Sequence, residues 1–413
     1  PTKMEGFPVR LNYEYCDRLI GKKLGNETIK RIVESLEMKV EKEDTEGLNL
    51  LVPPYRVDVQ RPCDVVEDIL RIYGYNNVEI PTELKSSLTI AEEADKNYHR
   101  ENIIGEQLVG AGFSEIMNNS LTKSSYYEET GLNAYPWEET VKVMNPLSAD
   151  LGVMRQTLLF GGLESIVRNV NRKAQNLRFF EVGNVYKFNK EKWSEESPVK
   201  AYSQDYHMAL WVTGKRIQGS WAHPDEESTF YELKAYVENI LRRIGIAQGL
   251  LVSEKSDNNV FDKAIALKTR AGKVLVEMGI LSHKLLKSFD IDQKVYYAEL
   301  DWAGLMKAIR KNKLQFQEIS KYPAVSRDLA LLVDNNVEFA AIEEIARQTD
   351  KKLLKRVELF DVYQGKNLPE GKKSYAVNFI LQDETKTLND KAIDAIMQKL
   401  IKNLTNKLGA ELR

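Results

Sequence analysis

The stretch LLKRVELFDVYQGKNLPEGKKSYAVNFILQD, residues 353–383, decides the fold of the C-terminal part of the chain. It contains two β-rich runs joined by KNLPEGK, a turn in which Pro and Gly interrupt regular structure. A strand-like run, SRDLALLVD, and a helix over residues 340–348 precede it. An amphipathic helix over residues 390–408 follows, with Asn389 as its N-cap, Gly409 as its stop and AELR as a last short strand. The order β-α-β-β-α-β predicts a ferredoxin-like domain.

The two preceding parts of the chain also mix helices with strands. Residues 88–313 contain the β-rich runs MALWVTG, IALKT, VLVEMGIL and VYYAELD, without the regular alternation of βαβ crossovers. This pattern predicts a mixed or antiparallel sheet with helices packed on it. Residues 1–85 contain helices over 13–20 and near 27–37, two strand-like runs and an acidic helix, which indicates a small α/β module. The predicted fold class is therefore α+β, with three domains.

Composition excludes several classes of protein. The 413 residues are 43% hydrophobic and 29% charged, which is typical of soluble globular domains. No apolar run approaches the roughly 18 residues of a membrane span, and the N-terminus PTKMEGFPVR has no apolar signal region. This N-terminus, which lacks an initiator Met, looks like a cut from a longer protein. Two distant cysteines, Cys16 and Cys63, fit a reducing cytosol, so we expect a cytoplasmic protein without membrane contact.

The sequence shows no signature of a self-sufficient active site. It has neither a Gly-rich dinucleotide fingerprint nor a P-loop, and no G-x-S-x-G or H-E-x-x-H motif. The four histidines are isolated from one another in the sequence. We therefore predict no catalytic residue. The net charge of −2 gives no global positive field, so any RNA contact must be local.

The stretch VPPYRVDVQRPCDVVEDILRIYGYNNVEIP, residues 52–81, carries a cluster of carboxylates. Asp58 ends a strand-like run, Pro62 marks a helix start, and the next acids stand at i, i+3 and i+4 of that helix. The candidate metal ligands are Asp58, Asp64, Glu67 and Asp68. Carboxylate oxygens suit Mg²⁺, but acids in a first helical turn also simply offset the helix dipole in water. Spacing alone leaves both interpretations open.

Two further segments combine basic and acidic residues. Arg155 lies between an apolar run and a helix that opens with two glycines, so it could face an anion near helix N–H groups or hold an interface together. In RFFEVGNVY, the period of two on a strand points Arg178 and Glu181 to opposite faces. We favour structural roles for all three residues.

A basic set suggests RNA binding in the last domain. Residues 351–373 include seven Lys and Arg but only three acidic residues, and aromatic residues lie between them in the sequence. Such a composition suits single-stranded RNA, but it also suits an ordinary solvated sheet edge. The candidate RNA-binding residues are Lys351, Lys352, Lys355, Arg356, Lys366, Lys372 and Lys373.

Taken together, these runs resemble the β chain of bacterial phenylalanine–tRNA ligase over essentially the whole length. The most specific parts of this resemblance are the acidic stretch over residues 52–81, VMNPLSADLGVMRQTLL, RFFEVGNVY, FYELKAYVE, and YPAVSRDLALLVD together with the stretch over residues 353–383. The resemblance implies an acidic-helix domain over residues 1–85, an inactive class II synthetase-like domain over 88–313 and a ferredoxin-fold anticodon-binding domain over 316–413. It also implies that the family's N-terminal tRNA-binding and editing parts lie outside this sequence.

The resemblance implies partners and cofactors as well. An α chain would hold the catalytic site and the ATP within an (αβ)₂ heterotetramer that binds tRNA. The four carboxylates would share a Mg²⁺ with that chain, although Asp68 is commonly Glu in the family. The run SDNNVFDKA, residues 256–264, departs from a His-Pro-Gly-Arg-like run of relatives. We expect a β-chain portion that is inactive alone; a stand-alone RNA-binding module is the alternative.

Overall fold

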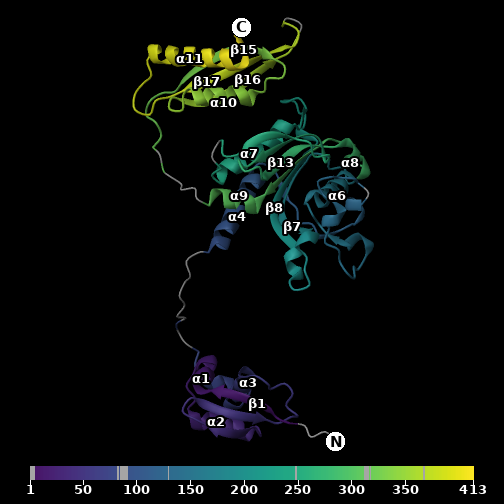
Figure 1. Ribbon diagram of the computed structural model, residues 1–413, viewed down its shortest axis with the longest axis vertical. Helices are drawn as coiled ribbons and strands as arrows, with labels where there is room; N and C mark the ends of the chain where they lie inside the picture. The colour runs from purple at the N-terminus through teal and green to yellow at the C-terminus, as the bar shows by residue number, and fades with distance from the viewer. Residues whose placement is uncertain are drawn as a thin grey trace. The chain divides into compact units, whose positions relative to one another are not determined.

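The computed structural model describes residues 5–80, 83, 92–128, 130–246, 249–310, 316, 318–365 and 368–413. The chain forms two units, residues 1–99 and 100–413, and each is described by itself. The second unit contains a large sheet and a separate four-stranded sheet (Figure 1). Among the described helices, none is long and apolar enough to cross a membrane.

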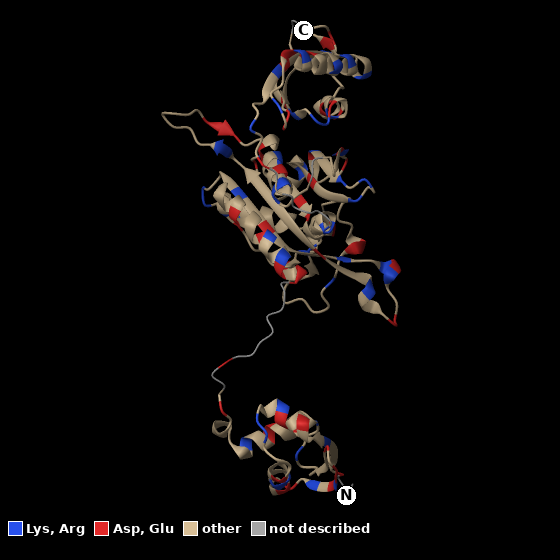
Figure 2. Cartoon of the chain, turned by 90° about the vertical axis from the view of Figure 1, so that its left-hand side faces the viewer, with Lys and Arg blue, Asp and Glu red and all other residues tan. Residues whose placement is uncertain are grey.

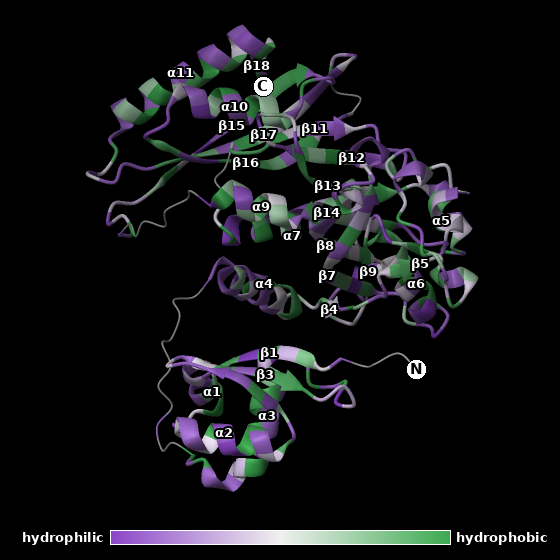
Figure 3. Cartoon of the chain, turned by 60° about the horizontal axis from the view of Figure 1, so that its bottom comes forward, coloured by the Kyte–Doolittle hydropathy of each residue, from purple (hydrophilic) through white to green (hydrophobic). Residues whose placement is uncertain are grey.

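The first unit is a three-stranded antiparallel sheet covered by three helices. Its elements are β1 (Phe7–Asn12), α1 (Tyr13–Ile20), α2 (Asn26–Ser35), β2 (Lys39–Glu43), β3 (Gly47–Val52) and α3 (Pro62–Tyr73). The strand order is β1-β3-β2. Leu48 and Leu50 of β3 pack with Ile29 of α2 and with Val65 and Ile69 of α3 in one buried core. Figure 3 shows the apolar residues of β3 and α3.

The prediction that Asp58 ends a strand is wrong. Strand β3 stops at Val52, and turns carry the chain from there to α3. Pro53 and Pro54 explain the early end, because neither residue can donate a backbone hydrogen bond to a ladder. Helix α3 itself runs as predicted from Pro62 to the residue before Gly74.

The large sheet of the second unit has seven strands in the order β11-β12-β13-β14-β8-β7-β4. Its strand pairs are antiparallel except for the parallel pair β4–β7, so the sheet is mixed, which is one of the two arrangements that the sequence predicts. The strands of this region are β4 (Ser114–Glu115), β5 (Leu121–Thr122), β6 (Val153–Met154), β7 (Leu177–Phe188), β8 (Tyr202–Thr213), β9 (Lys215–Ile217), β10 (Glu226–Glu227), β11 (Val252–Ser256), β12 (Phe261–Lys268), β13 (Val274–Leu281) and β14 (Val295–Asp301). The helices are α4 (Glu93–Gly110), α5 (Ser125–Glu128), α6 (Leu159–Val170), α7 (Phe230–Arg243), α8 (His283–Ser288) and α9 (Trp302–Ile309).

Alternation along the strands divides this region into two cores. Met208, Leu210 and Val212 of β8 point to a core closed by α4, α7 and α9. Ala209 and Trp211, one residue out of step, point to the opposite core, which α6 and α8 close. The large sheet is therefore buried on both faces.

The C-terminal domain has the predicted ferredoxin-like order. It contains β15 (Val325–Asp334), α10 (Phe339–Thr349), β16 (Leu354–Tyr363), β17 (Lys372–Leu381), α11 (Asp390–Leu408) and β18 (Glu411–Leu412), and the sheet order is β16-β17-β15-β18. The predicted caps of α11 are confirmed: the Asn389 side chain accepts a hydrogen bond from the Ala392 N–H at 2.9 Å, and Gly409 has a φ of +62°. Helices α10 and α11 close a core on one face of the sheet.

Charges of both signs are interspersed along the helices, as the net charge of −2 leads one to expect (Figure 2). The distribution of charge along the helices therefore does not indicate where a nucleic acid would bind. The contacts of individual side chains are needed to locate such a surface.

Candidate nucleic-acid interface and associated sites

The sheet of the C-terminal domain has one open face, and a bulge in β16 determines which side chains reach it. Leu359 packs against the core, and the ladder with β17 shifts register between Leu359 and Asp361. Phe360 is therefore an extra residue in β16. An uninterrupted period of two would point Asp361 and Tyr363 into the core; the bulge turns both to the open face.

A cavity of about 360 Å³ lies on this open face. It is lined by Ala330, Asp361, Tyr363, Ser374, Ala376 and Arg413. The Arg413 Cζ lies 5.4 Å from the centroid of the Tyr363 ring. Ser374 is 6% exposed, and its hydroxyl has no hydrogen-bond partner among the described residues.

These cavity residues have the chemistry of a base-binding site. An aromatic ring and a guanidinium plane stack on nucleic-acid bases, and a carboxylate and a hydroxyl can hydrogen-bond to the edge of a base. Short side chains at Ala330 and Ala376 leave space beside the Tyr363 ring. The bulge and the C-terminal strand thus bring together residues that lie up to 83 positions apart, from Ala330 to Arg413.

The structure places three of the seven predicted cations in ion pairs. Lys355 pairs with Glu384 at 2.7 Å, Arg356 pairs with Glu358 at 2.8 Å, and Lys372 pairs with Glu411. Lys373 is 8% exposed, with its Nζ 4.8 Å from the centroid of the Tyr375 ring. Lys366 lies outside the described residues.

Two predicted cations are placed differently. Lys351 and Lys352 are exposed in the turn before β16, and neither forms an ion pair within the described part of the chain. They remain the best-placed phosphate contacts of the predicted set. Binding of tRNA by any of the seven cations stays a prediction.

The acidic helix holds its carboxylates with arginines. The Arg56 Nη2 lies 2.7 Å from the Asp68 Oδ2 and 3.1 Å from the Asp58 Oδ2. Arg71, one turn further along α3, binds the other oxygen of Asp68, which is 4% exposed. Hydrogen bonding and charge from Arg56 lower the pKa of Asp58, and the bonds to Asp58 and Asp68 raise the pKa of Arg56.

The other two carboxylates of the cluster point elsewhere. Asp64 accepts the backbone N–H of Arg61 at 2.9 Å and that of Gln60 at 3.2 Å, as a helix cap does. The Arg61 side chain and these N–H groups hold the pKa of Asp64 well below its ordinary range. Glu67 is exposed to solvent.

This arrangement does not fit a Mg²⁺ site as the side chains stand. Mg²⁺ needs oxygens that converge on one point at about 2.1 Å, and here arginines occupy those of Asp58 and Asp68. Within the described ranges, no group of three or more His, Cys, Asp or Glu side chains could hold a metal ion. Magnesium shared with a second chain stays a prediction.

The face of the large sheet below α6 is filled by buried side chains. Arg155 is 7% exposed and binds Glu181 at 2.6 Å and the carbonyl oxygen of Asn184 at 2.9 Å. Gly162 of α6 lies against Trp211, because a Cβ on Gly162 would meet the indole at 2.1 Å. Arg155 therefore has the structural role that the sequence favours, but its partners Glu181 and Asn184 lie within the same domain and not across an interface.

Arg178 and Glu181 point apart, as the strand period predicts. The Arg178 Nη2 lies 3.1 Å from Glu232 of α7, on one side of the sheet. Glu181 bonds to Arg155 and to the Asn118 side chain, on the α6 side. The two residues therefore take part in two separate structural ion pairs.

A second, half-buried pair on the α6 side was not anticipated from sequence. The His207 Nδ1 lies 2.8 Å from Glu299, whose other oxygen accepts hydrogen bonds from Thr157 and Tyr297 at 2.6 Å each. Burial lowers the pKa of His207, but the hydrogen bond and charge of Glu299 outweigh it and leave a raised pKa. Burial likewise raises the pKa of Glu299, and His207 reverses the shift so that it is lowered.

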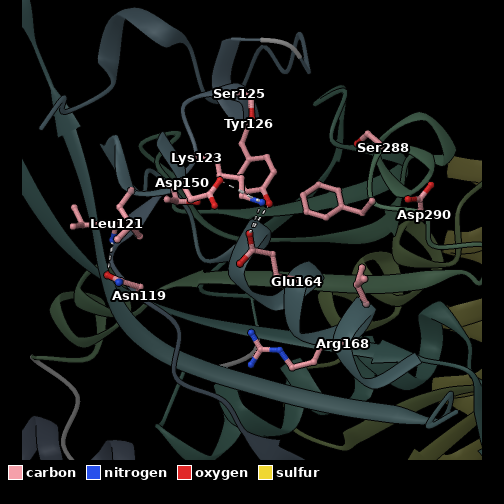
Figure 4. Close-up of a pocket in the computed structure, with 14 residues that line it drawn as sticks. Asn119, Leu121, Lys123, Ser125, Tyr126, Asp150, Glu164, Arg168, Ser288 and Asp290 are labelled. Carbon is pink, nitrogen blue, oxygen red and sulfur yellow. Dashed lines mark hydrogen bonds and ion pairs between the residues drawn. The ribbon is translucent and has the colours of Figure 1, made fainter. Parts of the chain in front are cut away.

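A surface cavity of about 670 Å³ lies beside α6 (Figure 4). The Tyr126 hydroxyl donates to the Glu164 Oε1 at 2.5 Å, and the Lys123 Nζ lies 3.8 Å from Asp150 and 4.0 Å from Glu164. These contacts connect α5 and the preceding Lys123 to α6 and to the turn that contains Asp150. Lys123 lies near Asp150 and Glu164, and Arg168 and Asp290 add one charge of each sign to the lining, so this cavity presents no clear preference for a ligand of one sign.

The departing run over residues 256–264 has a structural role. The Asn258 side chain donates to Glu277 at 2.9 Å, and the Asn259 side chain donates to the Gly131 carbonyl oxygen at 2.8 Å. The turn between β11 and β12 is thereby fixed to its neighbours.

Sequence reasoning missed five of the six residues that line the cavity beside Tyr363: Ala330, Asp361, Ser374, Ala376 and Arg413. One signal was present, since small or polar residues at 374, 376 and 378 alternate with the apolar Tyr375, Val377 and Phe379. Such alternation indicates a sheet with one uncovered face.

Family models match all three parts of the chain. The phenylalanyl tRNA synthetase beta chain CLM domain matches residues 80–302, the tRNA synthetase B5 domain matches residues 9–75, and the ferredoxin-fold anticodon binding domain matches residues 320–413. The first of these covers more than half of the chain.

Curated relatives extend the similarity over nearly the whole chain. The phenylalanine–tRNA ligase beta subunit of Bacteroides thetaiotaomicron is 61% identical over 409 residues, which is 99% of this chain and 50% of the relative. The beta subunits of Bacteroides fragilis and Porphyromonas gingivalis are 59% and 49% identical, over 99% and 98% of this chain and 50% and 49% of theirs. The chain thus spans about half the length of the curated relatives it matches.

Proposed function

Because the chain belongs to the family of phenylalanyl-tRNA synthetase beta chains, we propose that it supports the ATP-dependent attachment of phenylalanine to tRNA. In this proposal a separate alpha chain binds ATP and performs the chemistry. This chain contributes a tRNA-binding surface and a scaffold for the alpha chain within an (αβ)₂ heterotetramer.

The observation that carries the proposal is the cavity beside Tyr363 and Arg413. Sequence-specific proteins reach RNA bases in unpaired loops, where bases can turn outward and stack on aromatic rings and guanidinium planes. The open sheet face offers both groups 5.4 Å apart, with Asp361 and Ser374 beside them. An unpaired base of the tRNA anticodon loop fits this chemistry, and the match to an anticodon-binding family model supports it.

The filled face of the large sheet supports an inactive synthetase-like domain. Trp211 and Tyr297 fill the sheet face under α6 and are at most 1% exposed. We propose that this domain binds the alpha chain and leaves ATP to it.

The whole-chain match favours a ligase subunit over a stand-alone RNA-binding module. The relatives named as beta subunits align with 98–99% of this chain, including the large-sheet region that an RNA-binding module would not need.

Aminoacylation kinetics test the proposal. We would reassemble the ligase from the alpha chain and a full-length beta chain carrying Tyr363→Ala, and measure phenylalanine attachment to tRNA. The proposal expects KM for tRNA to rise about tenfold, since one base stack contributes about 1–3 kcal/mol, while the rate of ATP-dependent phenylalanine activation stays unchanged.

The matched control is Asp394→Asn, an exposed position on α11, which packs on the other face of the sheet. An unchanged KM in the Tyr363→Ala enzyme would overturn the assignment of tRNA to this face. ATP-dependent activation by this chain without the alpha chain would overturn the assignment of the chemistry.

A further inference from the structure

A hairpin projects from the large-sheet region and carries an exposed tryptophan at its turn. It consists of β9, the turn that follows and β10, and we call residues 215–227 the arm. Figure 2 shows the arm standing out from the body of the region, with β9 in blue and β10 in red. Trp221 in its turn is 100% exposed. Tyr231, in the first turn of α7 directly after the arm, is 78% exposed.

Hydrogen bonds fix the turn that carries Trp221. The Ser220 N–H donates to the His223 carbonyl oxygen at 2.8 Å. The Gly219 N–H donates to the Asp225 Oδ1 across the turn. Trp221 is therefore presented on an ordered turn, so little conformational entropy would be lost when a partner covers its ring.

The base of the arm is fixed to the large sheet. The Lys215 N–H donates to the Asn176 Oδ1 at 2.8 Å, and the Arg178 Nη2 donates to the Arg216 carbonyl oxygen at 3.0 Å. The arm is thus a fixed projection that holds Trp221 away from the two cores of this region.

The charge of the arm argues against RNA as its partner. Its two cations are paired, Lys215 with Asp225 at 2.6 Å and Arg216 with Glu226 at 2.9 Å. Glu227 is exposed and forms no ion pair within the described part of the chain. Three acids therefore outnumber two cations, and phosphates would meet net negative charge. The arm instead suits a protein surface that has an apolar pocket with a cation at its rim.

The two exposed rings fit within one protein interface. The Ser228 N–H donates to the Gly214 carbonyl oxygen at 3.0 Å and closes the arm three residues before Tyr231. From this point to Trp221 the chain extends at most about 23 Å. A standard interface covers roughly 800 Å² on each partner, which corresponds to a patch roughly 30 Å across. Trp and Tyr are among the side chains that dominate binding in such patches.

We propose that the arm docks on the alpha chain, with Trp221 inserted into an apolar pocket of that chain and Glu227 beside a cation at the rim of the pocket. The inference rests on the proposed function, since it locates where this scaffold holds the alpha chain. It assigns the contact to a projecting hairpin and not to the faces of the large sheet, both of which are filled.

Dissociation kinetics test the arm. The alpha chain is immobilised, and surface plasmon resonance follows the full 413-residue chain as it binds and leaves. Trp221→Ala should raise the dissociation rate about thirtyfold, as expected for loss of a central aromatic anchor. Trp221→Phe should retain most of the residence time, and Tyr231→Ala should raise the rate less than Trp221→Ala does.

The matched control is Trp193→Ala. Trp193 is 49% exposed and lies in the loop before β8, whereas the arm follows β8. This variant should dissociate from the alpha chain as the unaltered chain does.

Association kinetics test the acidic rim. Glu227→Lys should slow association at low salt, and the difference from the unaltered chain should disappear at high salt, because a rim charge acts mainly on the association rate. Glu196→Lys makes the same change at an exposed position in the loop of Trp193 and should associate normally. Equal association rates for Glu227→Lys and the unaltered chain at low salt would refute the assignment of a cation to the rim.

Acrylamide quenching shows whether Trp221 becomes covered. The difference in fluorescence between the unaltered chain and Trp221→Phe isolates the signal of Trp221. Acrylamide should quench this signal freely in the isolated chain and much less after the alpha chain binds. Phenylalanine tRNA added without the alpha chain should give no protection.

The outcomes separate the arm from the proposed function. If Trp221→Ala dissociates like the unaltered chain, or Trp193→Ala dissociates as fast as Trp221→Ala, the arm is refuted and the scaffold role stands. Protection of Trp221 by tRNA and not by the alpha chain would assign the arm to RNA and overturn the inference. If the unaltered chain does not bind the alpha chain at all, the scaffold role fails and the inference fails with it.

Discussion

The guanidinium of Arg413 lies over the ring of Tyr363, with 5.4 Å between Cζ and the ring centroid. Tyr363 ends β16 and Arg413 directly follows β18, so the contact forms only when β18 joins the sheet beside β15. The two residues line the cavity in which we place an unpaired base.

Replacing Arg413 tests how the pair acts. Arg413→Ala should weaken RNA binding by about 1 kcal/mol, because the chain loses both a positive charge and a planar stacking group. Arg413→Lys keeps the positive charge but lacks the planar guanidinium, so its affinity for RNA should lie between those of the unaltered chain and Arg413→Ala. Anisotropy titrations at one fixed salt concentration measure this order; equal affinities for the Lys variant and the unaltered chain would show that charge alone matters.

The exposed pair Lys351 and Lys352 should contribute charge without sequence information. For single strands, each phosphate contact adds about 0.7 to the slope of log affinity against log salt. The double change to Ala should therefore lower the slope by roughly 1.4 if each lysine contacts one phosphate. Titrations from low to high salt measure the slope, and the ion-paired Lys355 provides the comparison. A slope that falls as much in Lys355→Ala would contradict the choice of Lys351 and Lys352.

Arg56 should be a major stabilising residue of the first unit. Its removal leaves Asp68, which is 4% exposed, with Arg71 as its one ion-pair partner among the described residues. Loss of one partner of a buried ion pair costs about 3–5 kcal/mol, and the remaining contact to Arg71 reduces this to about 2–3 kcal/mol. We expect Arg56→Met to speed hydrogen exchange of the α3 amides accordingly.

The matched change Arg61→Met removes an exposed arginine from Asp64 and should affect exchange far less. Measuring both variants in EDTA and in Mg²⁺ shows whether an ion can replace Arg56. Equal exchange in Arg56→Met and the unaltered chain in EDTA would contradict the role assigned to Arg56.

The His207–Glu299 pair should make the stability of the middle domain depend on pH. The folded-state pKa of His207 is raised above its ordinary 6.5, so its contribution is complete below that pH and is lost as pH rises through the folded value. The folded-state pKa of Glu299 is lowered from 4.5, so its contribution is present above 4.5 and is lost as pH falls through the folded value. The pair should stabilise most between these limits.

The five tryptophans all lie between residues 137 and 302, so their fluorescence follows the middle domain. We expect the thermal midpoint of the unaltered chain to fall as pH rises above 6.5, and His207→Gln to abolish that fall. His207→Gln should also lower the free energy of unfolding at pH 6 by about 1–3 kcal/mol. A variant with the same pH dependence as the unaltered chain would show that other groups govern it.

Long periodic segments could be predicted from sequence alone. Strands β13 and β14 and helix α11 have the bounds that their apolar patterns indicate, because each packs one regular face on a core. The ferredoxin-like order followed from these segments and from the turn KNLPEGK.

The cavity beside Tyr363 and Arg413 could not be predicted in this way. The bulge at Phe360 reverses the facing of Asp361 and Tyr363, and a period-of-two argument places both on the wrong side. Charge counting likewise gave equal weight to seven cations, although Lys373 is buried and Lys355 is held by Glu384. Asp68 binds Arg56, which lies twelve positions earlier in the sequence. This contact depends on tertiary structure and could not be predicted from the spacing of the acids.

Direct binding of tRNA to this chain tests the central claim most directly. The experiment is an equilibrium titration of phenylalanine tRNA with four proteins: the unaltered chain, Tyr363→Phe, Tyr363→Ala and Asp394→Asn. It compares loss of the Tyr363 hydroxyl, loss of the whole ring and a control substitution. The account predicts that Tyr363→Phe retains most of the affinity, that Tyr363→Ala loses about tenfold, and that Asp394→Asn loses none. Equal affinity of all four proteins would contradict the assignment of tRNA to the open sheet face.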